Sequence, residues 1–151
     1  MSLRYIEAID RIKSVEREHK ATRFATEYLL NALRHDASPL QIENLRVRGV
    51  YNAGEQLEGT YLIRLFAEFE TSLRSFLHDV GAKRPPARTR DLLDRVAAKC
   101  RISHAQIRNA HAVREYRNVL VHERTGEVDA VSLAQARSHL CRFLDGLANR
   151  W

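Results

Sequence analysis

The stretch REYRNVLVHERTG, residues 114–126, combines residue types that can cleave a phosphodiester bond. His122 can exchange a proton at cellular pH, because an unperturbed imidazole titrates near pH ~6.5. Arg117 can hold two phosphate oxygens with its planar guanidinium and keeps its charge. Asn118 precedes His122 by one helical turn, so it can orient the imidazole or bind phosphate. The three residues are therefore a candidate site for RNA cleavage by positioned side chains.

These residues belong to a predicted helix over residues 104–123. At ~100° per residue, its core-facing side carries Val113, Tyr116 and Leu120. Arg117 and His122 are about 140° apart around an ideal helix, so one regular helix cannot easily direct both at one phosphate. A twofold dimer, in which a second copy supplies half of the site, would remove that difficulty. The opposite, polar face carries His104, Arg108, His111, Glu115, Asn118 and His122.

A structural explanation exists for each candidate residue. His122 near a helix C-terminus is favourable through the helix dipole alone. Arg117 can pair with a carboxylate at the edge of the core, and Asn118 can be a solvated surface residue. The spacing alone therefore leaves both the chemical and the structural explanation open.

Glu70 is expected to support the site. It lies between Phe66 and Leu73 on the apolar face of a predicted helix, where an unpaired carboxylate would be costly. Its partner is either Arg117, whose guanidinium it would then orient, or another arginine in a purely structural ion pair.

Other basic residues of the same helix are candidates for RNA binding. His111 and Arg114 are expected to line the groove of the site, while His104 and Arg108 are expected to be solvated and within reach of an RNA backbone. His104, His111 and His122 spread over five turns, too far apart for one metal ion. We therefore expect neither a metal site nor a cofactor.

The elements that must position these residues are predicted to be helices, because six Gly and three Pro separate long periodic segments. The pattern predicts an all-α, up-and-down bundle of four to five helices. In the first helix, Phe24 and Tyr28 are expected to continue an apolar stripe from Ile6 to Leu33. Residues 35–55 are expected to form a loop. The predicted helices cover residues 3–33, 55–80, 90–99, 104–123 and 133–149.

Several residues predict where helices start and end. Ser103 with Gln106, and Ser132 with Gln135, have the spacing of a capping box, in which each side chain accepts from the other residue's amide. Thr89 is a candidate cap for the short helix, and Gly126 fits the end of the helix that begins at 104.

Composition limits the class of protein. The 151 residues suit a single domain, 1–151. No apolar run approaches the ~20 residues of a membrane span, and the N-terminus lacks a signal peptide, so we expect a cytoplasmic protein without membrane contact. Cys100 and Cys141 are expected to be buried, reduced thiols. The net charge of +6 favours a polyanionic partner such as RNA or DNA, although an arginine-rich genome would give the same excess.

RNVLVH, residues 117–122, resembles the R-x4-6-H signature of the HEPN superfamily in its form with Asn after Arg. The segment YLIRLFAEFETSLRSFL, residues 61–77, is similar to the aromatic and Leu-rich helix of that family. The resemblance implies a small helical bundle that acts as a metal-independent endoribonuclease, often a toxin or phage-defence protein and often a homodimer. It also implies that Arg117 and His122 are the catalytic pair, with Asn118 as their polar companion, and that an antitoxin protein is a partner to test for.

One position departs from a common form of the family. HEPN toxins paired with nucleotidyltransferase antitoxins tend to have R-x4-H-x-Y, in which the Tyr receives AMP, whereas this chain has Arg124 there. Tyr116 precedes the motif on another face and cannot replace it. We therefore expect no regulation by adenylylation of this stretch.

Three interpretations follow. The first is a HEPN-type endoribonuclease that cleaves single-stranded RNA. The second is a non-catalytic HEPN-type module that binds RNA or a nucleotide in the same groove. The third is a helical interaction protein in which the RN…H pattern is accidental, and it predicts no basic groove near His122.

Overall fold

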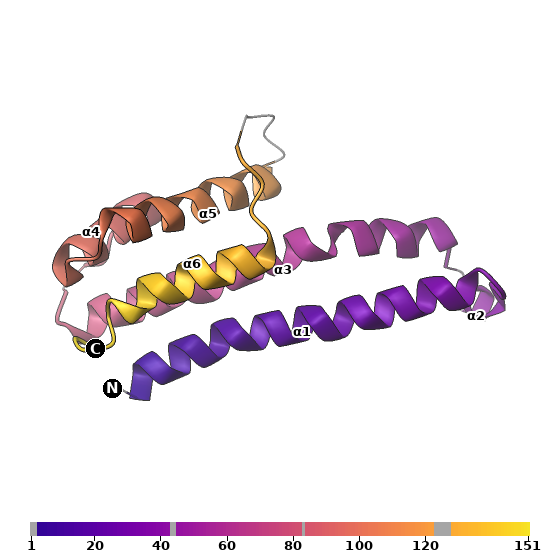
Figure 1. The fold of residues 1–151 in the computed structure, drawn as a ribbon, viewed down its shortest axis with the longest axis horizontal. Coiled ribbons are helices and arrows are strands. Elements are labelled where there is room, and N and C mark those ends of the chain that lie inside the picture. The colour runs from indigo at the N-terminus through magenta and orange to yellow at the C-terminus, as the bar shows by residue number, and fades with distance from the viewer. Residues whose placement is uncertain (1–2, 43–44, 83, 123–127) are drawn as a thin grey trace.

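In the computed structural model, residues 3–42, 45–82, 84–122 and 128–151 are described, and over these ranges the chain is helical without any strand (Figure 1). A short helix at the turn after the first long helix stands apart, and the remaining five build a bundle. The all-α bundle prediction is therefore confirmed. The helices are α1 (Leu3–Leu33), α2 (Ser38–Ile42), α3 (Val47–Asp79), α4 (Thr89–Cys100), α5 (His104–His122) and α6 (Leu133–Asp145).

Helix α3 is the centre of the bundle, because it contacts α1, α4, α5 and α6. Figure 1 shows α1 running antiparallel to α3, and α5 antiparallel to α6. The predicted apolar face of α3 is buried throughout, as is the predicted inner face of α6. Aromatic rings meet between them, with Phe69 and Phe143 edge to face at 5.4 Å between centroids. This core fixes α3 and, through it, the helix that carries the candidate site.

Both predicted capping boxes are present. The Ser103 Oγ accepts from the Gln106 amide at 3.3 Å while the Ser103 amide donates to the Gln106 side chain at 3.2 Å. Ser132 and Gln135 make the same reciprocal pair at the start of α6. The prediction that Thr89 caps the short helix is wrong. Helix α4 already includes Thr89, because the backbone of Arg88 is the extended residue and its carbonyl accepts from the amide one turn ahead.

The loop predicted for residues 35–55 is wrong over most of its length, because α2 and the first two turns of α3 occupy it. Gly49 and Gly54 interrupted the periodic pattern and concealed the helix. Gly54 has a packing role, since a Cβ atom at this position would lie 3.3 Å from the methyl of Thr26 on α1. The glycine thus lets α3 approach α1 closely without ending the helix.

The apolar stripe predicted along α1 is correct for Ile9, Ile12, Val15 and Leu33 and wrong for Ile6, which is 41% exposed, and for Phe24 and Tyr28. Ile12 and Val15 are buried, but Phe24 and Tyr28 are each 71% exposed. Past Val15, the side of α1 that faces α3 carries the buried His19, whose ring meets Tyr61 at 5.4 Å between centroids. Phe24 and Tyr28 therefore lie on the outer side of α1, where they stack on each other.

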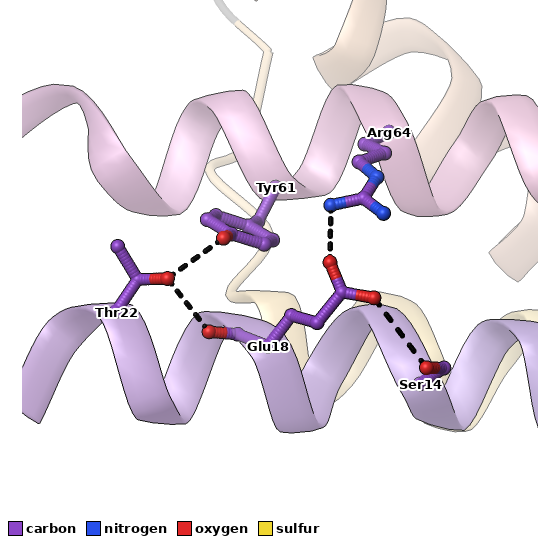
Figure 2. A network of polar contacts seen from close by, with 5 residues as sticks. All are labelled: Ser14, Glu18, Thr22, Tyr61 and Arg64. Carbon is purple, nitrogen blue, oxygen red and sulfur yellow. Dashed lines mark hydrogen bonds and ion pairs between the residues drawn. The ribbon is translucent and has the colours of Figure 1, made fainter.

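A polar network joins α1 to α3 beyond the core (Figure 2). The hydroxyls of Thr22 and Tyr61 are 2.8 Å apart, and Thr22 also donates to the carbonyl of Glu18 at 2.9 Å. The Glu18 carboxylate accepts from Arg64 and from Ser14. In this part of the pair, hydrogen bonds join α1 to α3, whereas apolar packing joins them nearer the N-terminus of α1.

The two ends of the chain meet at one end of the bundle (Figure 1). Tyr5 on α1 donates to Asp145 on α6 at 2.6 Å, which raises the pKa of Tyr5 to about 12. Asp79 at the end of α3 accepts from Trp151 Nε1 at 2.9 Å and pairs with Arg4. In the helices that the structure describes, we find no apolar stretch of the length required to traverse a bilayer.

Candidate active site

Arg117 points from α5 toward α3 and not along the polar face of its own helix. Its guanidinium carbon lies 4.8 Å from the centroid of the Phe66 ring, in cation–π geometry. One of its nitrogens is 3.7 Å from Glu70 Oε2, and the side chain is only 19% exposed. Phe66 and Glu70 are one turn apart on α3, so together they fix the direction of the guanidinium.

Glu70 is paired, as a carboxylate on an apolar helix face must be. Both partners left open by the sequence are present, because Arg74 donates to Oε1 at 2.6 Å and Arg117 approaches Oε2. Arg74 also donates to the carbonyls of Pro86 and Ala87 ahead of α4, at 2.9 and 3.3 Å. A continuous polar chain therefore runs from α5 through α3 to the segment that leads into α4. Arg74 was missed, although its position four residues after Glu70 predicts such a pair.

His122 is the last residue of α5, and its side chain is exposed. Asn118, one turn earlier on the same face, is half-buried. In the described parts of the chain, no hydrogen bond or ion pair joins Arg117, Asn118 and His122. Arg117 is directed toward α3 whereas His122 is exposed at the end of α5, in keeping with the roughly 140° between them on an ideal helix.

His111 and Arg114 border a groove between α4 and α5 of about 550 Å³, which also includes Arg108. This groove includes neither Arg117 nor His122, so the prediction that His111 and Arg114 line the groove of the site is wrong for the single chain. His111 Nε2 lies 2.8 Å from Asp94 Oδ1 on α4, and Arg114 donates to Glu115 at 3.1 Å. His104, at the first position of α5, is exposed and outside this groove. Sequence reasoning missed Asp94, because nothing in the sequence shows how α4 crosses α5.

Neither cysteine has the surroundings of a reactive nucleophile. Cys100 is buried and Cys141 is half-buried, and both are free thiols. Burial raises the pKa of each thiol, which lowers the fraction of reactive thiolate. Over the residues with described positions, no three His, Cys, Asp or Glu side chains gather closely enough to hold a metal ion.

Two sequence predictions fall on residues 123–127, outside the described residues. They are the expected lack of adenylylation around Arg124 and the helix end at Gly126. Up to His122 the predicted helix is confirmed.

Comparisons of the chain with protein-family models, with curated proteins and with solved structures gave no match.

Proposed function

We propose that this protein is a metal-independent endoribonuclease of the HEPN type that cleaves single-stranded RNA. The observation that supports the proposal best is the environment of Arg117, whose guanidinium is held by Glu70 and Phe66 of α3. Arg117 itself belongs to α5, the helix that ends in the exposed His122. A fixed cation and an accessible proton carrier are the two groups that cleavage of RNA by side chains requires.

In the proposed reaction, His122 accepts the proton of a ribose 2′-hydroxyl as the 2′-oxygen attacks the adjacent phosphorus. The bond from phosphorus to the 5′-oxygen of the next nucleotide breaks, and that oxygen takes a proton from water to become a hydroxyl. The protonated His122 then returns its proton to the solvent. Arg117 stabilises the charge on the phosphorane through two parallel N–H donors. Asn118 orients the imidazole or binds phosphate. The products are a 2′,3′-cyclic phosphate and a 5′-hydroxyl.

We also propose a homodimer as the active species. Within one chain Arg117 faces α3 and His122 lies at the end of α5, so a phosphate between two copies could meet both groups. A biological role as a toxin or phage-defence protein, with an antitoxin as partner, belongs to the same proposal. Light scattering at micromolar concentration tests the assembly, and a monomer would contradict it.

The decisive experiment measures cleavage of labelled RNA in EDTA by the parent protein and by matched histidine variants. His122→Ala should lower the rate by about 100-fold or more, because proton transfer typically contributes this much. His104→Ala is the control, since His104 is also exposed and begins the helix that His122 ends. It should leave the rate within about twofold, as expected for a group that makes no contact in the transition state. Cleavage that survives in His122→Ala, or that vanishes in EDTA, would refute the assignment.

A second variant pair tests Arg117. Arg117→Lys should also lose activity, because an ammonium cannot reproduce the two-pronged contact. Glu70→Gln should retain a reduced rate, since it loosens the guanidinium without removing it.

The alternative is a module that binds RNA or a nucleotide without cleaving it. It is favoured by the separation of Arg117 and His122 within one chain. Tight RNA binding with no cleavage at any protein concentration would establish this alternative.

A further inference from the structure

The groove between α4 and α5, here called the α4–α5 groove, carries more cationic groups than its own carboxylates engage. Its charged lining comes from two helices that the sequence alone does not bring together. Three arginines and a histidine share it with two acids, namely Arg90, Arg108, His111, Arg114, Asp94 and Glu115.

Both carboxylates of the groove already have partners. Asp94 is bonded to His111 at 2.8 Å, and Glu115 accepts from Arg114 at 3.1 Å. Arg90 and Arg108 are exposed, and neither has a carboxylate partner among the residues whose positions are described. The groove therefore presents two guanidinium groups, one from each helix, to an incoming anion.

The position of Arg108 relates the groove to the candidate active site. Arg108, His111, Asn118 and His122 share one face of α5. Arg108 and His122 are fourteen residues apart, which is about 21 Å along the helix axis. A single strand that follows this face can place one phosphate near His122 and others, several nucleotides away, in the groove.

We infer that the α4–α5 groove binds backbone phosphates of a single RNA strand, through Arg90 and Arg108, several nucleotides from the phosphate that His122 meets. The identity of the strand as RNA rests on the proposed function. The inference adds Arg90 of α4 to the interface. It also gives the substrate a minimum length, since a dinucleotide at His122 cannot reach the groove.

Salt-dependent binding tests the inference directly. The affinity for a fluorescent oligouridylate of twelve nucleotides is measured by anisotropy at several salt concentrations, in a His122→Ala background that prevents cleavage. Each phosphate contact on a single strand contributes about 0.7 to the slope of log affinity against log salt. Arg90→Ala/Arg108→Ala should therefore make the slope shallower by about 1.4.

The matched control is Arg17→Ala/Arg34→Ala, which removes the same charge from exposed residues on and just after α1. Figure 1 shows α1 on the opposite side of α3 and α6 from α4 and α5. The control should leave the slope unchanged, and circular dichroism verifies that both variants are folded. An equal loss of slope in both variants would overturn the inference, because net charge and not the groove would then govern binding. An unchanged slope in Arg90→Ala/Arg108→Ala would also overturn it.

Cleavage rates separate this inference from the proposed function. In the His122-containing protein, Arg90→Ala/Arg108→Ala should lower kcat/KM for the twelve-nucleotide substrate and leave that for a uridine dinucleotide unchanged. If RNA is bound with the expected salt slope but never cut, the inference about the groove is supported and the proposed ribonuclease activity is refuted. If RNA is cut and Arg90→Ala/Arg108→Ala matches the parent in salt slope and in rate, the ribonuclease activity is supported and the inference about the groove is refuted.

Discussion

The two ends of the α1–α3 pair are stabilised differently. At the bundle end, Phe66, Phe69 and Phe76 of α3 are at most 1% exposed beneath α4, α5 and α6. At the other end, residues 20–33 of α1 and 47–54 of α3 form a two-helix arm, along which no other long helix of the described residues runs (Figure 1). Phe24 and Tyr28 lie on the arm and are 71% exposed. Aromatic side chains therefore remove much apolar surface from water at the bundle end and very little in the arm.

The polar network of Figure 2 lies at the junction of these regions. Thr22, Tyr61 and Arg64 take over from the apolar contacts of Ile12 and Val15. The difference teaches that helix pairing depends on hydrogen bonds at the junction and on close backbone approach at Gly54 in the arm, whereas the bundle end depends on removing apolar surface from water. The candidate site draws its rigidity from the bundle end, since Glu70 and Phe66 belong to it.

The largest effect is expected from exchanging the same residue type in the two regions. Phe69→Ala should lower the free energy of unfolding by about 3–5 kcal/mol, because it removes a buried ring and leaves a cavity. Phe24→Ala should change it by less than about 0.5 kcal/mol, as for most surface substitutions. Urea denaturation followed by circular dichroism measures both. Similar losses would show that Phe24 is covered in solution.

An intermediate effect is expected at the junction. Tyr61→Phe removes the hydroxyl that meets Thr22 at 2.8 Å and should cost about 1 kcal/mol, the usual net value of one hydrogen bond. Tyr28→Phe is the control, because its hydroxyl is on the exposed side of the arm. The same denaturation experiment compares them, and a Tyr61→Phe protein as stable as the parent would mean that the network does not hold the arm.

The smallest effect is expected from pH. Hydrogen bonds from Arg4 and Trp151 lower the pKa of Asp79 from 3.8 to about 2. Because the pKa is lowered by folding, the stabilisation is present above pH about 4 and is lost as the pH falls toward 2. Asp79→Asn should therefore flatten the decline of the melting temperature over this window.

Asp36→Asn extends the pH comparison to the tip of the arm. Asp36 accepts only local hydrogen bonds from Ser38, two residues away, and these lower its pKa. Its replacement should change the pH dependence less than that of Asp79, which joins distant parts of the chain. A larger change for Asp36 would contradict the comparison.

Local patterns predicted most of the fold. The start of α6 follows from Ser132 and Gln135, and the buried face of α3 follows from its apolar spacing, because both depend on residues within a few turns. Such patterns failed where tertiary packing decides. From the sequence alone, Gly54 indicates the end of a helix, whereas in the structure it allows close packing against Thr26. Phe24 fits a buried apolar stripe in the sequence, but in the described arm no helix covers it.

The candidate site was predictable to the same degree. The pairing of Glu70 follows from its apolar surroundings, and the separation of Arg117 and His122 follows from helix geometry. The approach of Asp94 to His111, and the presence of Arg90 and Arg108 in one groove, depend on the crossing of α4 over α5. No local signal encodes that crossing, so these pairs required the structure.

The meeting of the two chain ends has a mechanical consequence. Helices α1 and α6 run antiparallel with Tyr5 and Asp145 beside both ends. A pulling force applied at Arg4 and Trp151 would load this corner first and then separate the two helices one contact after another. Such peeling resists force far less than sliding helices past each other, in which many contacts must break together. We therefore expect a pulling experiment that holds the chain at residues 4 and 151 to unfold this domain at low force, however stable its core is at equilibrium.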